Sequence, residues 1–234
     1  PEYECLTVFE FRGNEGPWAK KIPFREGFSD TRKMLNVEAG ASRWQEGLTL
    51  QGELLCRAHM RNHSLAEIFS PCRLWLEDIR GLATGSEEQL VVPGKYVDRI
   101  WKNCFVRSSG CVYIDQEWEV GNPVPLKVLI IRSIYAFILD CATMSGINPV
   151  LGIHSGKKLI RMIGESIGVE ISVGDMKEFI LFESEFLALC LGTSKHIEKK
   201  KLNAVVWNRP WRFLETHLRR RFRRLKKLRL YWKR

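Results

Sequence analysis

The longest apolar run of the chain, residues 126–141, limits the possible folds more than any other feature. The run contains Lys127, Arg132 and Asp140, and it is shorter than the roughly 20 apolar residues that a membrane-spanning helix needs. It therefore predicts a buried helix over about 126–142 rather than a transmembrane segment.

Apolar residues recur at intervals of three and four in several other stretches, which indicates further helices. This spacing extends from residue 48 to about 79, with a polar turn at 62–64. It returns at about 155–167 and 174–192. The second half of the chain is therefore predicted to be largely helical.

Strand signals dominate the N-terminal part. Residues 3–11 and 17–24 are rich in aromatic and β-branched residues on either side of a Gly-containing turn, which predicts a hairpin. A short helix over about 31–39, capped by Ser29 or Asp30, is predicted to follow. A second hairpin is expected at about 103–106 and 111–114. These elements predict an α+β fold of two lobes.

Charge divides the chain at about residue 195. Of the 37 Lys and Arg residues, 16 lie in residues 195–234 with only two acids, so this segment carries +14 and residues 1–194 carry −4. We therefore expect three parts: a reduced β-rich N-lobe with its hinge at 1–47, a helical C-lobe at 48–194, and a basic tail at 195–234. A basic arm implies an anionic partner.

The seven cysteines are widely spaced, odd in number and free of any C-x-x-C pair. This pattern excludes a disulfide scaffold or zinc ribbon and indicates reduced thiols in the cytoplasm. The composition, with 45% hydrophobic and 27% charged residues, excludes general disorder. The N-terminus shows no signal peptide, and its first residue, Pro rather than Met, suggests a piece of a longer polypeptide.

Residues 95–118 carry the strongest chemical signal. Asp98 precedes Asn103 by five positions, and Asp115 follows at the end of the predicted second hairpin. In a kinase core, such an Asp orients the acceptor hydroxyl and accepts its proton, while the Asn and the second Asp hold Mg²⁺. The alternative is that Asp98 and Asn103 cap a turn and Asp115 ends a strand, which are common roles for these residues.

The same region resembles the kinase-like segment of bacterial surface-polysaccharide proteins, such as the methyltransferase/kinases that cap O-antigen chains. The resemblance covers roughly residues 43–140 and is strongest over 93–132. The positions that fit the pattern are Pro93, Gly94, Asp98, Asn103, Asp115, Glu117, Trp118, Pro123, Pro125, Leu126 and Arg132. The resemblance implies a fold like that of protein kinases and aminoglycoside phosphotransferases, with ATP and Mg²⁺ as cofactors.

A phosphate-binding lysine is expected in the second strand. Strand alternation puts Ala19 and Lys21 on one face, so Lys21 is the candidate ligand of the ATP phosphates, with Lys20 as the substitute. Glu38 is a candidate ion-pair partner for Lys21. Two features depart from the kinase pattern: no G-x-G-x-x-G precedes Lys21, and Tyr96 stands where many kinases carry a His.

The tail at 209–234 alternates apolar and aromatic positions with basic ones at helical spacing. It is predicted to be a basic amphipathic helix suited to an anionic membrane surface or to a partner helix, with nucleic acid as the less favoured partner. We therefore expect a cytoplasmic protein with a peripheral attachment to the inner membrane.

The resemblance implies transfer of the ATP γ-phosphate to a sugar hydroxyl of lipopolysaccharide O-antigen or capsule. Two alternatives stay open. One is a non-catalytic kinase-like module that tethers a polysaccharide-synthesis enzyme to the membrane. The other is the C-terminal part of a SAM-dependent methyltransferase.

Overall fold

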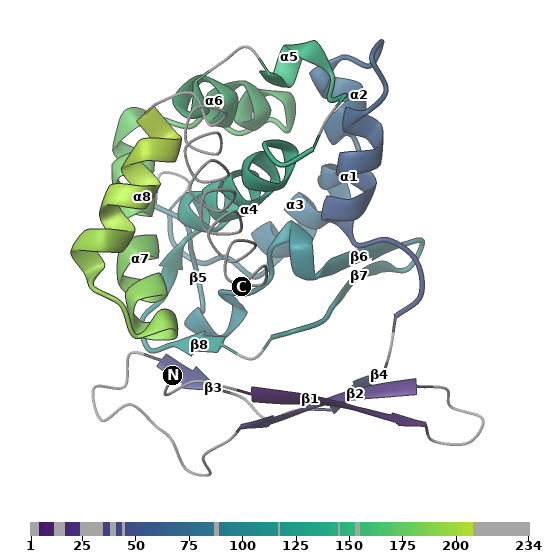
Figure 1. Cartoon of the computed structure of the whole chain (residues 1–234), viewed down its shortest axis with the longest axis vertical. Helices are drawn as coiled ribbons and strands as arrows, with labels where there is room; N and C mark the ends of the chain where they lie inside the picture. The colour runs from purple at the N-terminus through teal and green to yellow at the C-terminus, as the bar shows by residue number, and fades with distance from the viewer. Residues whose placement is uncertain are drawn as a thin grey trace, which may run out of the picture.

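The computed structural model describes residues 5–11, 17–23, 35–37, 41–43, 45–86, 89–116, 118–144, 146–152 and 155–207. Within these residues the fold is mixed α+β, as the sequence predicts. A small antiparallel sheet at the N-terminal end lies apart from a larger helical body, and a short strand pair lies between them (Figure 1).

The N-terminal sheet has three strands in the order β1-β2-β4: β1 (Cys5–Phe11), β2 (Pro17–Pro23) and β4 (Ala41–Arg43). Strands β1 and β2 are antiparallel over their whole length, which confirms the predicted hairpin. Two runs of β-forming residues around a Gly-containing turn were a sufficient local signal for this element.

The predicted helix over 31–39 is wrong where the structure describes it. Residues Leu35–Val37 form strand β3, which pairs antiparallel with β8 (Trp118–Val120). The partner strand lies far away in the sequence, so pairing in the folded chain overrides the local helical preference. This pair connects the N-terminal part of the chain to the segment that follows Asp115.

The helical body contains eight helices within the described residues, and polar caps begin several of them. Thr49, Ser64, Ser155 and Ser172 each accept a hydrogen bond from a backbone N–H in the first turn. The helices are α1 (Leu50–Ala58), α2 (Leu65–Phe69), α3 (Cys72–Gly81), α4 (Leu126–Cys141), α5 (Pro149–Gly152), α6 (Gly156–Ser166), α7 (Val173–Leu191) and α8 (Lys195–Trp207).

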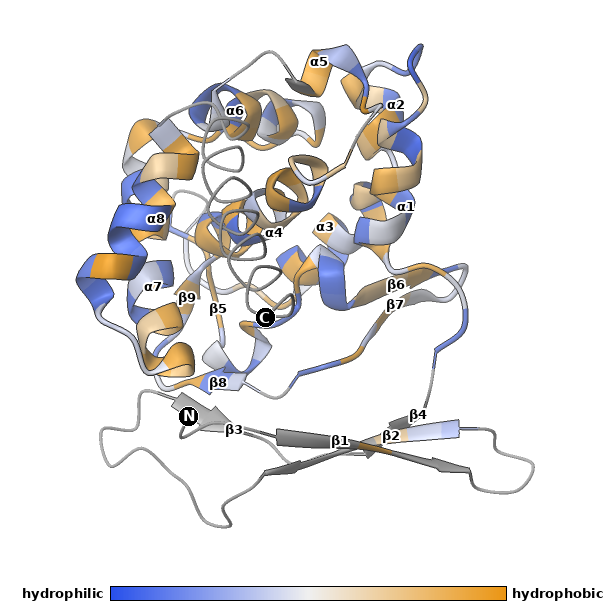
Figure 2. Cartoon of the chain, viewed as in Figure 1, coloured by the Kyte–Doolittle hydropathy of each residue, from blue (hydrophilic) through white to orange (hydrophobic). Residues whose placement is uncertain are grey.

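Helix α4 is the predicted buried helix, and it contributes much of the core. It packs against α1, α6 and α7, and its apolar residues face the interior of the body (Figure 2). One end of the core is a cluster of rings with centroids 5.2–6.3 Å apart: Phe69, Trp75, Trp101 and Phe137. Within the described part of the chain, no helix is both long and apolar enough to cross a membrane.

Helix α8 extends the packed body past residue 194. Its residues Leu202, Val205 and Val206 are buried, and it packs along α7. A Cβ at Gly156 would lie 2.2 Å from the Val205 carbonyl oxygen, so α6 and α8 touch through a position that only glycine fits. Residues 209–234, the predicted amphipathic helix, lie outside the described residues.

Two short antiparallel strand pairs connect the helices around the candidate site. Strand β5 (Val91–Val92) pairs with β9 (Val124–Pro125), just before α4. Strands β6 (Cys104–Arg107) and β7 (Gly110–Tyr113) form the second predicted hairpin, with bounds one residue from those expected. Gly110 has a φ of 125°, a conformation that glycine adopts far more readily than other residues, so it closes the turn.

Candidate functional site

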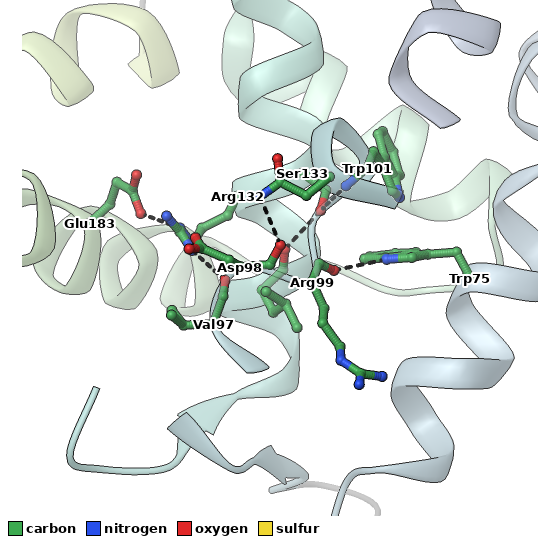
Figure 3. A network of polar contacts seen from close by, with 10 residues as sticks. Trp75, Val97, Asp98, Arg99, Trp101, Arg132, Ser133 and Glu183 are labelled. Atoms are coloured by element: carbon green, nitrogen blue, oxygen red, sulfur yellow. Dashed lines mark hydrogen bonds and ion pairs between the residues drawn. The ribbon is translucent and has the colours of Figure 1, made fainter. Parts of the chain in front are cut away.

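Asp98 lies in a loop between two short 3-10 helices, Gly94–Tyr96 and Trp101–Asn103. Side chains of α3 and α4 hold the backbone of this loop in place (Figure 3). The hydrogen bonds are Arg132 Nη1 to the Val97 carbonyl at 2.5 Å, Trp75 Nε1 to the Arg99 carbonyl at 2.9 Å, and the Trp101 N–H to Ser133 Oγ at 3.4 Å. The loop, which we define as the anchored loop 97–103, is therefore fixed by the core beneath it.

Asp98 and Asn103 are both buried, with 5% and 9% of their surfaces exposed. Asn103 Nδ2 donates a hydrogen bond of 3.1 Å to the Asp98 backbone carbonyl, which closes the loop. A side-chain-to-backbone hydrogen bond of this kind is expected if Asn103 simply caps the turn. It also brings together the two residues that a kinase catalytic loop needs in one place, so the structure accommodates both interpretations.

The hairpin of β6 and β7 returns the chain to this loop. Cys104 pairs with Tyr113, and the Ile114 N–H donates to the Asn103 carbonyl at 2.9 Å, so Asp115 follows directly after the residue bonded to Asn103. Asp115 is exposed and has a φ of 53°, the left-handed conformation that Asp tolerates better than most residues. The hydrogen bond between Ile114 and Asn103 thus brings the backbone of Asp115 close to the end of the anchored loop.

A buried cluster of charges lies behind the anchored loop. Arg132 Nε donates to Glu183 Oε2 at 2.6 Å, and its Nη1 lies 3.8 Å from Asp98 Oδ1. All three side chains are at most 8% exposed. Burial lowers the pKa of Arg132, but the negative charges of Glu183 and Asp98 outweigh it and raise that pKa above its ordinary value. Arg132 is therefore a buried cation that contacts both the loop backbone and Asp98.

Aromatic rings support the same cluster. The Arg132 guanidinium lies 4.5 Å from the centre of the Phe186 ring, and Trp118 packs edge-on against that ring at 6.2 Å. Arg132 and Trp118 are both positions of the sequence pattern on which the resemblance rests. The structure adds that Arg132 also lies beside Asp98, and that α7 supplies its partners Glu183 and Phe186.

Arg99 connects the anchored loop to the hairpin on its other side. Its guanidinium lies between the rings of Tyr96 and Tyr113, 4.3 and 4.4 Å from their centres, and forms an ion pair with Asp78 at 3.4 Å. The Tyr113 hydroxyl donates to Asp78 at 2.6 Å, and burial followed by this hydrogen bond raises the pKa of Tyr113. Tyr96, which replaces the usual kinase His, is thus part of a stacked arrangement.

Gly94 lets the end of β8 and the residues after it approach the 3-10 helix that precedes the anchored loop. A Cβ there would lie 1.9 Å from the Val120 carbonyl oxygen and 2.7 Å from that of Asn122. We expect Gly94→Ala to lower the free energy of unfolding by about 1–3 kcal/mol, because backbone atoms must move to admit the methyl group.

Urea denaturation followed by circular dichroism measures this loss. Gly81→Ala is the matched control, because Gly81 is in a helix and its Cβ would have nothing within 4 Å. That variant should be as stable as the wild type or more stable by about 0.5–1 kcal/mol. Equal stabilities of the two variants would contradict the close contact at Gly94.

The predictions for Lys21 and Glu38 concern residues that the structure describes only in part or not at all. Lys21 lies in β2 with its backbone opposite Thr7, but its side chain is outside the described part of the structure. Glu38 is also outside the described residues. The assignment of Lys21 as a phosphate ligand therefore stays a prediction.

A metal at this site would depend on few protein ligands. Among the described residues, no group of three or more His, Cys, Asp and Glu side chains could hold a metal ion. Mg²⁺ commonly takes only one or two protein carboxylates together with phosphate oxygens and water. The oxygen donors of Asn103 and Asp115 fit that mode of binding by their chemistry, with nucleotide phosphates completing the ligand set.

Comparison with known proteins finds no significant match to this chain. No protein-family model matches the chain, and neither the curated proteins nor the solved structures give a significant match. The features that point to a function are therefore those of this chain alone: an anchored loop with Asp98 and Asn103, and a hairpin that leads from this loop to Asp115.

Proposed function

We propose that the chain is a two-lobed, kinase-like phosphotransferase domain that uses ATP and Mg²⁺ to phosphorylate a sugar hydroxyl of a bacterial surface glycan. Asp98 would orient the hydroxyl, Asn103 and Asp115 would hold Mg²⁺, and Lys21 would bind the ATP phosphates. The observation that carries the proposal is the anchored loop 97–103 with the hairpin that follows it. The O-antigen or capsule setting follows from the resemblance over residues 93–132.

The chemistry of phosphoryl transfer requires positioning more than covalent participation by the protein. Asp98 would accept a hydrogen bond from the acceptor hydroxyl and take its proton as the new oxygen–phosphorus bond forms. The Arg132 cation, 3.8 Å from Asp98 Oδ1, stabilises negative charge on that carboxylate before the proton arrives. Bound Mg²⁺ would neutralise charge on the phosphates. The loop backbone accepts hydrogen bonds from Trp75 and Arg132 and donates one to Ser133, and these bonds hold the loop in place.

Nucleotide binding is the first test. A thermal shift of the purified full chain with Mg²⁺-ATP should raise the melting temperature by about 5–10 °C at a hundredfold excess over Kd, because ligand binds only the native state. Asp115→Asn should lose more than half of the shift, since it removes a carboxylate ligand but keeps a residue type that tolerates the left-handed conformation.

Asp140→Asn is the control, because Asp140 lies at the far end of α4 and bonds Gln51 instead of the loop. It should keep the full shift. If the wild type shows no shift with Mg²⁺-ATP, the nucleotide site is absent and the phosphotransferase proposal fails.

A non-catalytic docking module would then be the better interpretation, and the structure supplies one observation in its favour. The outward side of α8 combines the exposed Lys199 and Lys200 with Ile197, which is 51% exposed. The sequence that follows, 208–234, holds twelve Lys and Arg against one Glu. A basic face with an apolar anchor suits an anionic membrane surface, through which the module would tether a polysaccharide-synthesis enzyme.

A further inference from the structure

A groove of about 140 Å³ lies between the segment after β8 and helix α7. Residues 120–123 form one wall of this groove. Phe182, Glu185, Phe186 and Leu189 of α7 form the other. None of these residues belongs to the predicted catalytic set, so the groove is a separate feature beside it.

The α7 wall presents an aromatic surface. The rings of Phe182 and Phe186 are stacked with an interplanar angle of 12° and centroids 6.1 Å apart. Phe186 is 6% exposed and packs against Arg132 and Trp118 on its inner side, whereas Phe182 is only partly buried. Arg132 and Trp118 therefore support the pair through Phe186, and both rings line the groove.

Polar groups lie at the edges of this aromatic surface. The Glu185 side chain is 44% exposed, and its Oε2 accepts a hydrogen bond from Lys195 Nζ at 3.0 Å, which fixes the carboxylate at one edge. Asn122 supplies an exposed carboxamide on the opposite wall. An aromatic face with a carboxylate and a carboxamide beside it matches a sugar ring, which has apolar C–H faces and a rim of hydroxyl groups.

One wall of the groove is connected to the anchored loop, and the other contacts the 3-10 helix Gly94–Tyr96 that precedes this loop. Phe186 contacts Arg132, whose Nη1 lies 3.8 Å from Asp98 Oδ1. On the other wall, the Val120 and Asn122 carbonyls lie so close to Gly94 that no Cβ fits between them. Two side chains in contact, Phe186 and then Arg132, therefore connect the groove to Asp98.

We infer that this groove binds one sugar ring of the glycan acceptor, with Phe182 under the ring and Glu185 and Asn122 hydrogen-bonded to its hydroxyl groups. This inference depends on the proposed function for the sugar's role as acceptor, but binding to the groove needs neither nucleotide nor metal. The volume suits a single ring rather than an extended oligosaccharide. The ring bound here would hold the acceptor so that a hydroxyl of a neighbouring sugar is directed toward Asp98.

Saturation-transfer NMR on the full chain without nucleotide tests the site. The probes are the methyl glycosides of mannose, glucose, galactose, N-acetylglucosamine and rhamnose. At least one probe should give a saturation-transfer signal with the wild type. Its Kd should rise about tenfold in Phe182→Leu, which keeps an apolar side chain but removes the aromatic face. Glu185→Gln should weaken the same probe by a similar factor, because a carboxylate is the stronger acceptor.

Two controls separate binding from folding. Lys195→Gln breaks the ion pair with Glu185 from outside the groove and should leave the Kd within about twofold, since the carboxylate remains. Leu181→Ala changes an exposed neighbour of Phe182 on the same helix, outside the groove, and should have no effect.

No signal from any probe, or a signal that Phe182→Leu and Glu185→Gln leave unchanged, would overturn the inference. Its failure is distinguishable from that of the proposed function. A chain that binds Mg²⁺-ATP but no glycoside loses the groove assignment only. A chain that binds a glycoside but no nucleotide keeps this sugar site without the phosphotransferase.

Discussion

Arg132→Met should lower the free energy of unfolding by about 3–5 kcal/mol, the cost typical of removing one partner from a buried ion pair. The substitution would leave Glu183 as a buried negative charge without its 2.6 Å partner. It would also remove the donor to the Val97 carbonyl at 2.5 Å. Methionine fills most of the volume, so the loss reports on charge and hydrogen bonding rather than on a cavity. Urea denaturation followed by tryptophan fluorescence measures it.

Arg73→Met is the matched control because Arg73 pairs with Glu77 at 2.9 Å but with 84% of its side chain exposed. It should cost about 0–1 kcal/mol, since water screens an exposed pair. The double variant Arg132→Met/Glu183→Leu should recover part of the stability, because it removes the uncompensated charge together with its partner. A loss for Arg132→Met no larger than that for Arg73→Met would contradict the buried cluster.

Elements that depend on local signals were predictable from the sequence. The hairpin of β1 and β2, the hairpin of β6 and β7, and helix α4 each follow from residue periodicity and from turn residues within a short window. The strand β3 was not predictable, because its identity comes from pairing with β8. The break between α2 and α3 had a signal, Pro71, which has no N–H to continue the hydrogen bonds of α2.

The residues of the candidate site likewise include some that local sequence signals indicate and some that only contacts in the folded chain reveal. The spacing of Asp98, Asn103 and Asp115 is local, so the sequence indicated all three. The contacts of Arg132 with Glu183 and Phe186 join α4 to α7, and no local pattern predicts such a contact. One signal was present: Glu183 and Ser184 interrupt the apolar residues of α7, and both are buried. A buried acid in an apolar helix requires a cation, and Arg132 in the apolar α4 is its complement.

Asp98→Asn should lower kcat by about a hundredfold to ten-thousandfold if the chain transfers phosphate as proposed, because the amide cannot accept the proton of the acceptor hydroxyl. The substitution preserves the shape of a side chain that is only 5% exposed. Transfer of radiolabelled γ-phosphate from Mg²⁺-ATP to the methyl glycoside that binds most tightly measures the effect. The KM for ATP should change little, since Asp98 is assigned to the acceptor rather than to the nucleotide.

Two comparisons make this result interpretable. Asp140→Asn, at the far end of the same helix that holds Arg132, should keep wild-type turnover. Asp98→Asn should also melt within a few degrees of the wild type, because Arg132 retains its 2.6 Å bond to Glu183. An active wild type with equal turnover in Asp98→Asn would remove Asp98 from the reaction. The hydrogen bond from Asn103 to the Asp98 carbonyl would then be explained by turn capping alone.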